Sequence, residues 1–150
     1  LLSGRVSGRY LIYCPLFCRD DQNQLRIRLE TDAVFLILRR IETGLYRAVV
    51  SPAHVKEVEA IEETSERLEM ERLLSRLSKS CEYDLSKARH RAEALIGSGF
   101  GIADAAHVAF AEQAASYFIT VDDKLLRRCA HAKLPIYAMS PLEFIAQEEP

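Results

Sequence analysis

The chain has 150 residues, of which 49% are hydrophobic and 28% charged, and its formal net charge is −2. This length and balance predict one compact globular domain rather than a disordered or fibrous chain. The charge argues against a strongly basic protein that coats nucleic acid. No apolar run approaches the roughly 18 residues that a bilayer-spanning helix needs.

The first residues have no sustained apolar core, so they do not resemble a secretory signal. We expect residues 1–8 to be a leader or flexible tail and residues 9–150 to form a single domain. The cysteines at 14, 18, 81 and 129 are irregularly spaced, with no Cys-x-x-Cys motif. This spacing argues against a zinc site and favours buried or reduced thiols in a cytoplasmic protein.

Strand and helix patterns alternate along the chain. Four short apolar segments predict buried strands, at 9–13, 46–51, 116–121 and 135–140. Amphipathic periodicity predicts helices over 23–44, 52–61, 65–77, 84–96, 102–115, 122–132 and 141–147. Ser51 and Asp84 are the expected caps of the second and fourth of these helices, and Gly44 is the expected stop of the first. This alternation predicts an α/β fold with a mostly parallel central sheet of about four strands flanked by helices. The crowded helices between 52 and 114 predict a helical subdomain inserted between the second and third strands.

Three acidic residues are predicted near strand ends or in the helices beside them. Asp122 follows the third strand, Glu57 lies on the helix after the second strand, and Asp104 lies in the first turn of an alanine-rich helix. In open parallel sheets, sites form at the carboxyl ends of strands, so these residues could converge there. Gathered carboxylates repel one another, and a divalent cation relieves that repulsion. Oxygen ligands favour Mg²⁺ or Mn²⁺ over zinc, and such an ion supports phosphodiester cleavage.

Each acid also has a structural interpretation. Asp104 could interact with the helix dipole and with free amides of the first turn. Asp122 could be the N-cap of the following helix, and Glu57 could belong to a solvated acidic face. For His107, one turn after Asp104, a supporting or packing role is favoured over metal ligation.

The segment GIADAAHVAFAEQAASYFITVDDKLLRRC resembles the C-terminal half of a PIN domain, the nuclease fold of many VapC-type toxins. The shared positions are an aspartate-alanine-x-histidine helix followed by a strand ending in threonine-x-aspartate, here Asp104, Ala105, His107, Ala109, Ala111, Thr120 and Asp122. PIYAMSPLEFI resembles the family's last strand and closing helix, and SPAHVKEVEAI resembles the helix with its second acid, which places Glu57 there. The resemblance spans about residues 9–146 and implies a PIN-like three-layer fold.

The resemblance implies a metal-dependent endoribonuclease, with Mg²⁺ or Mn²⁺ held by Glu57, Asp104 and Asp122. Thr120 would orient a carboxylate or water, and Arg127 and Arg128 would contact the RNA backbone; a solvated helix face is the alternative for these arginines. The family also implies a homodimer and, in operon-encoded cases, a toxin paired with a small antitoxin.

The first predicted strand departs from the family pattern. It has Ile12 and Tyr13 where the family has an aspartate followed by threonine or serine. Asp20 or Asp21, in the loop downstream, would be the substitutes. Loss of one carboxylate weakens a shared metal site, so a second hypothesis is a degenerate, catalytically impaired PIN domain that acts as a protein-interaction module. A third hypothesis is another metal-dependent phosphohydrolase. The sequence does not support it, because it contains neither a glycine-rich phosphate loop nor a nucleophile-elbow pattern.

Overall fold

The computed structural model describes residues 10–13, 24–79 and 81–148. Its helices are α1 (Gln24–Glu42), α2 (Pro52–Glu59), α3 (Thr64–Leu77), α4 (Leu85–Gly97), α5 (Ile102–Ala114), α6 (Asp123–Ala132) and α7 (Pro141–Glu148). Its strands are β1 (Tyr10–Tyr13), β2 (Arg47–Val49), β3 (Ser78–Lys79), β4 (Tyr117–Ile119) and β5 (Tyr137–Met139). The predicted leader at 1–8, Asp20, Asp21, Cys14 and Cys18 lie outside the described residues.

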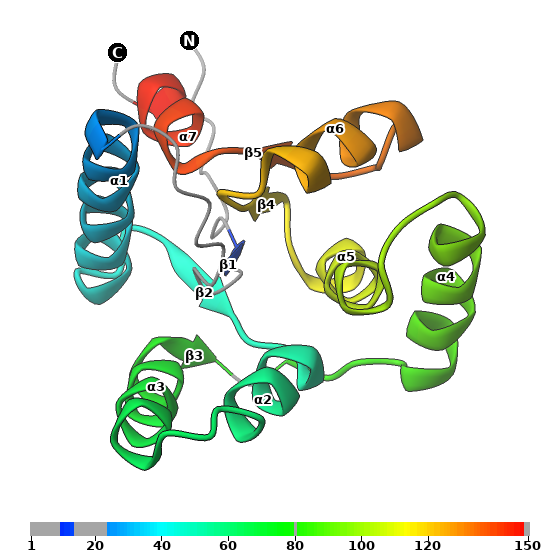
Figure 1. The fold of residues 1–150 in the computed structure, drawn as a ribbon, viewed down its shortest axis with the longest axis horizontal. Coiled ribbons are helices and arrows are strands. Elements are labelled where there is room, and N and C mark those ends of the chain that lie inside the picture. Colours follow the sequence, from blue (N-terminus) through cyan, green and yellow to red (C-terminus); the bar gives the residue numbers. More distant parts are fainter. Residues whose placement is uncertain (1–9, 14–23, 80, 149–150) are drawn as a thin grey trace, which may run out of the picture.

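The strands pair in the order β3-β2-β1-β4-β5, and every neighbouring pair is parallel. Ile12 of β1 is in register with Val49 of β2 on one side and Phe118 of β4 on the other. The ends of β2 and β4 therefore lie on either side of β1, at the same edge of the sheet. Figure 1 shows α5 and α6 beside that region and α1 with α7 on the opposite side.

The predicted PIN-like three-layer fold around about four strands is wrong. Most of the described residues are helical, the strands are only two to four residues long, and they number five in the described part of the chain. The predicted strands end early because the residues after them start helices: Ser51 caps α2 and Asp122 caps α6. The additional edge strand, β3, consists of Ser78 and Lys79, which carry no apolar strand signal.

Two apolar clusters hold the helices against the strands. Phe118 belongs to a cluster with residues of α4, α5 and α6, whereas the next residue, Ile119, belongs to a cluster with residues of α1 and α7. Successive strand residues point to opposite faces, so the two clusters lie on opposite sides of β4. Burial of these apolar side chains is the main favourable term for folding.

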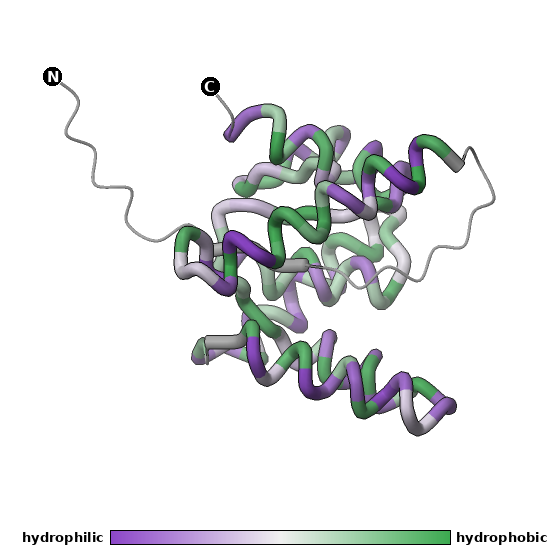
Figure 2. Tube along the Cα trace, turned by 90° about the vertical axis from the view of Figure 1, so that its left-hand side faces the viewer, coloured by the Kyte–Doolittle hydropathy of each residue, from purple (hydrophilic) through white to green (hydrophobic). Residues whose placement is uncertain are grey.

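Helices α2 to α5 lie between β2 and β4 in the chain and pack against the sheet. Helix α5 contributes Ala105, Val108 and Ala111 to the cluster around Phe118, and β3, which follows α3, pairs with β2. Apolar side chains of α3, including Met70 and Leu74, line a small hollow against β2. In Figure 2 purple and green residues alternate along the helices at the lower side, which is the amphipathic pattern of α2 and α3.

The helix boundaries agree well with the sequence patterns. Gly44 follows α1 with a φ of 80°, a left-handed conformation that glycine adopts without strain. Asp84 caps α4 as predicted, with its side chain accepting a hydrogen bond from the Lys87 amide. No helix among the described residues is both long and apolar enough to cross a membrane.

Candidate functional site

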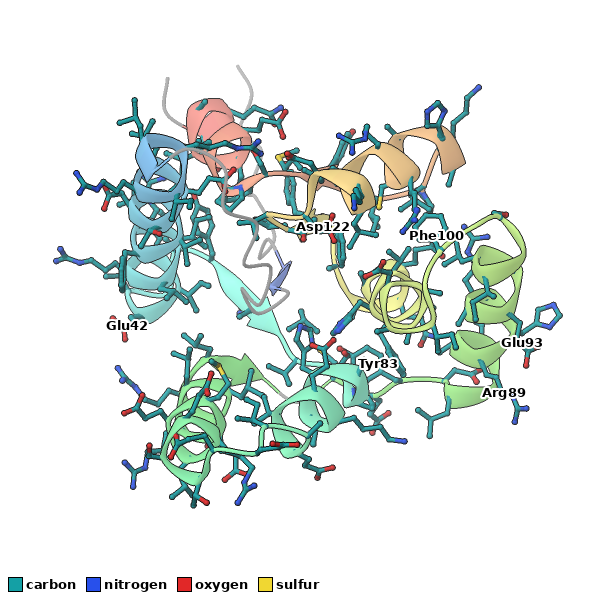
Figure 3. The ribbon with its side chains drawn as sticks, viewed as in Figure 1. Glu42, Tyr83, Arg89, Glu93, Phe100 and Asp122 are labelled. Atoms are coloured by element: carbon teal, nitrogen blue, oxygen red, sulfur yellow. The ribbon has the colours of Figure 1, made fainter. Side chains whose placement is uncertain are left out.

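Asp122 occupies the turn between β4 and α6, as labelled in Figure 3. Its Oδ1 accepts hydrogen bonds from the amides of Lys124 and Leu125, at 2.8 and 3.0 Å. The N-cap interpretation of Asp122 is therefore correct. The Asp122 amide donates to Thr120 Oγ1 at 3.2 Å, and Thr120 is buried. Thr120 thus supports the turn that presents Asp122.

Asp104 lies in the first turn of α5, which starts after Gly101. The small residues behind it, including Ala105 and Ala109, are buried and let the helix pack closely. A Cβ on Gly101 would lie 3.3 Å from Asp104 Oδ2, closer than ordinary contact, so the glycine leaves room for the carboxylate. Asp104 therefore stands at the start of a helix whose position is set by its buried alanines.

The three predicted acids influence one another electrostatically. Burial is the largest effect raising the pKa of Asp104 above its ordinary value, and the charge of Asp122 is the second. Glu57 raises the pKa of Asp104 further, whereas Arg128 and His107 lower it. Glu57 of α2 and Asp122 of the β4–α6 turn are therefore each near enough to act on Asp104 of α5.

Glu57 contacts α5 through His107. Its Oε1 lies 2.9 Å from His107 Nε2, a contact of ion-pair length rather than a well-aligned hydrogen bond. The contact with His107 is the main cause that lowers the pKa of Glu57, against a smaller opposing effect of burial. His107 is 1% exposed and supports Glu57 from inside the protein.

The arginines of α6 differ in their surroundings. Arg128 Nη1 lies 3.7 Å from Asp104 Oδ2, so this side chain borders the acids. Arg127 is exposed and lies near Asp123. The pKa of Asp123 is lowered mainly by a hydrogen bond from Arg26 of α1, at 2.5 Å, and the charge of Arg127 lowers it further. The Arg26–Asp123 pair, which sequence reasoning missed, connects the first turns of α1 and α6 across 97 positions. No short-range pattern could indicate such a contact.

From the sequence, Ser51 is predicted only as the N-cap of α2, and His54 has no predicted role. Both are buried, and the His54 ring contacts the His107 ring edge to face, with centroids 4.6 Å apart. Ser51, His54 and Glu57 are spaced three residues apart, which places them on one side of the start of α2. This spacing is the sequence signal that could have indicated that they lie together.

The donor atoms suit a hard divalent cation, because the three acids supply carboxylate oxygens alone. The described residues nevertheless include no group of three or more His, Cys, Asp or Glu placed to hold a metal ion. Asp122 Oδ1 is bound by the α6 amides, and Glu57 is in contact with His107. The donor chemistry therefore fits Mg²⁺ or Mn²⁺, while the three-ligand geometry is not formed by these residues.

Strand β1, which lies between β2 and β4 in the sheet, has the sequence Tyr-Leu-Ile-Tyr and therefore contributes no acid to this edge. Neither the known protein families nor the curated proteins include a match to this chain.

Proposed function

We propose that the chain is a metal-dependent endoribonuclease of the PIN type that hydrolyses RNA phosphodiester bonds. The observation that carries the proposal is that Glu57 and Asp122, from two separate elements, both act electrostatically on the half-buried Asp104, near the edge where β2 and β4 end. Such repulsion costs stability unless a cation relieves it, which is typical of a functional site rather than of a structural one.

In this proposal Glu57, Asp104 and Asp122 hold Mg²⁺ or Mn²⁺. When bound, the ion supplies an activated water and neutralises charge that develops on the scissile phosphate. Thr120 keeps the Asp122 turn in place through its hydroxyl. Arg127 and Arg128, both exposed on α6, bind flanking phosphates of the RNA. The remaining expectations from the family resemblance, a cytoplasmic toxin that forms a homodimer and binds an antitoxin, belong to the same proposal.

The test is cleavage of single-stranded RNA by the purified chain with Mn²⁺ or Mg²⁺, before and after chelation of the metal. Asp104→Asn should lower cleavage by more than about 100-fold, beyond the 10- to 100-fold typical of residues that only support ligands. Asp32→Asn, at an exposed position of α1, is the matched control and should leave cleavage unchanged. Equal cleavage by parent and Asp104→Asn would contradict the proposal.

A second candidate is a catalytically impaired interaction module. It is favoured by Ile12 at the strand position between β2 and β4 and by the absence of a three-ligand group among the described residues. This alternative predicts a folded protein that neither binds Mn²⁺ nor cleaves RNA. Titration calorimetry with Mn²⁺ separates the candidates, because only the nuclease needs the cation.

A further inference from the structure

Helix α4 lies at the outside of the molecule, and α5 lies between it and the strands (Figure 1). Ala88 and Leu95 are buried and hold α4 in the fold. Leu85 is 62% exposed and Ile96 is 40% exposed, although both side chains are large and apolar. Leu85, Ala92 and Ile96 follow one another at spacings of seven and four residues, so they form one stripe along the helix. This α4 stripe lies beside the buried side of the helix and leaves apolar surface in contact with water.

One charge of each sign accompanies the α4 stripe. Arg89 Nε lies 3.1 Å from Glu93 Oε1, one turn away, and the two side chains are 82% and 61% exposed. Figure 3 shows both residues on α4, far from Asp122. Because an exposed pair of this kind contributes little to stability, both groups can turn to a partner's charges at small cost.

The order of these residues makes this side of α4 complementary to itself. Leu85 and Ile96 lie at nearly equal distances on either side of the middle of the helix, and so do Arg89 and Glu93. When two copies of α4 pack antiparallel about a two-fold axis, a residue on one side of the middle meets its counterpart on the other side. Leu85 then meets the partner's Ile96, and Arg89 meets the partner's Glu93. A parallel pair would instead bring like charges together.

We propose that the α4 stripe, together with Arg89 and Glu93, is the surface through which two copies of this chain form an antiparallel two-fold dimer. Burial of the apolar side chains favours association, and the two Arg89–Glu93 contacts between the copies set the orientation. The inference rests on the homodimer of the proposed function, for which it names the surface. It involves none of the acids of the candidate site and no metal ion.

Sedimentation equilibrium of the purified chain over a range of concentrations tests the apolar part of the surface. The parent should have twice the 17.0 kDa mass of one chain. Leu85→Glu should raise the dissociation constant of the dimer by more than about 10-fold and should remain folded, because a glutamate suits the first turn of a helix. Leu68→Glu, at an exposed apolar position of α3, is the control. A monomeric parent, or a dimer that Leu85→Glu does not weaken, would overturn the proposal.

Charge reversal tests the antiparallel arrangement. Arg89→Glu leaves two acidic groups on each copy and Glu93→Arg leaves two basic groups, so neither variant should pair with itself. An equimolar mixture of the two should restore the dimer, because every charge then meets its opposite. Arg89→Gln removes a charge without creating repulsion, so this matched control should keep the dimer. A mixture that is no more dimeric than either variant alone would contradict the arrangement.

The mass measurements separate this inference from the nuclease proposal, since they need neither RNA nor Mn²⁺. A dimer that Leu85→Glu dissociates supports the α4 surface even when the parent cleaves no RNA. A monomer that cleaves RNA overturns the α4 surface and leaves the nuclease proposal standing.

Discussion

Arg128 Nη1 on α6 lies 3.7 Å from Asp104 Oδ2 on α5 and places a cation beside the acid of the candidate site whose pKa is raised. The side chains are 44% and 28% exposed, so water screens the pair and its contribution is small. Burial is the largest cause of the raised pKa of Asp104; Asp122 and Glu57 add to it, and Arg128 opposes them. The fold therefore favours the uncharged form of the Asp104 side chain.

Asp104→Asn should stabilise the folded protein at neutral pH. The raised pKa of Asp104 means that the fold favours the uncharged side chain, and asparagine is uncharged with nearly the same shape. A gain of about 1 kcal/mol would raise Tm by roughly 2–4 °C in a chain of this length. Thermal unfolding followed by circular dichroism measures it, with Asp32→Asn as control. A lower Tm would show that the Asp104 charge stabilises the fold.

The advantage of Asp104→Asn should depend on pH. The folded parent binds a proton at Asp104 more readily than the unfolded chain, so its stability falls as pH rises from the ordinary value of 3.8 through the raised pKa. The difference between variant and parent should be absent below about pH 3.8 and complete at neutral pH. Urea unfolding between pH 3 and pH 8 tests this. A difference that is constant over the whole range would contradict the assigned direction.

Substitutions at Asp122 should separate its capping role from cation binding. Asparagine is as good an N-cap as aspartate, so Asp122→Asn should keep Tm and lose Mn²⁺ affinity. Asp122→Ala should also lose about 1 kcal/mol of stability, because two α6 amides lose their acceptor. The matched control is Asp84, which caps α4. Asp84→Asn should leave both quantities unchanged, and an equal loss of Mn²⁺ affinity there would argue against a role for Asp122.

The arginines of α6 should contribute to RNA binding through its phosphates. Arg127→Gln and Arg128→Gln should each weaken single-stranded RNA binding and reduce the slope of log affinity against log salt by about 0.7. Fluorescence anisotropy between 50 and 200 mM salt, as typical conditions, measures the slope. Arg89, labelled in Figure 3 on α4 and far from Asp122, is the control. A similar change in Arg89→Gln would indicate a diffuse charge effect.

Cys129 should resist alkylation in the folded protein. It is 2% exposed, and burial, with a smaller effect from Asp104, raises the pKa of its thiol to about 12. The thiolate is the reactive form, so little of it exists at pH 8. Iodoacetamide labelling followed by peptide mass spectrometry should modify the half-buried Cys81 before Cys129, which should react only in denaturant. Rapid labelling of native Cys129 would show that α6 opens readily.

Local patterns located most elements of this fold. The caps Ser51 and Asp84 and the stop at Gly44 lie where the sequence places them, because each acts within one turn of its helix. The predicted strands are longer than the observed ones, because the residues at their ends, such as Ser51, already begin the next helix. Strand β3 was missed, because Ser78 and Lys79 become a strand only by pairing with β2.

The sequence by itself determined which residue types are available: three carboxylates, Thr120 directly after β4 and no acid in β1. Only the tertiary structure decided which of them interact. His107 meets Glu57 because α2 and α5 pack together, and Arg26 meets Asp123 because α1 and α6 begin near each other. Periodicity describes one element at a time, whereas these contacts depend on how separate elements pack, so residues far apart in sequence meet without any local signal.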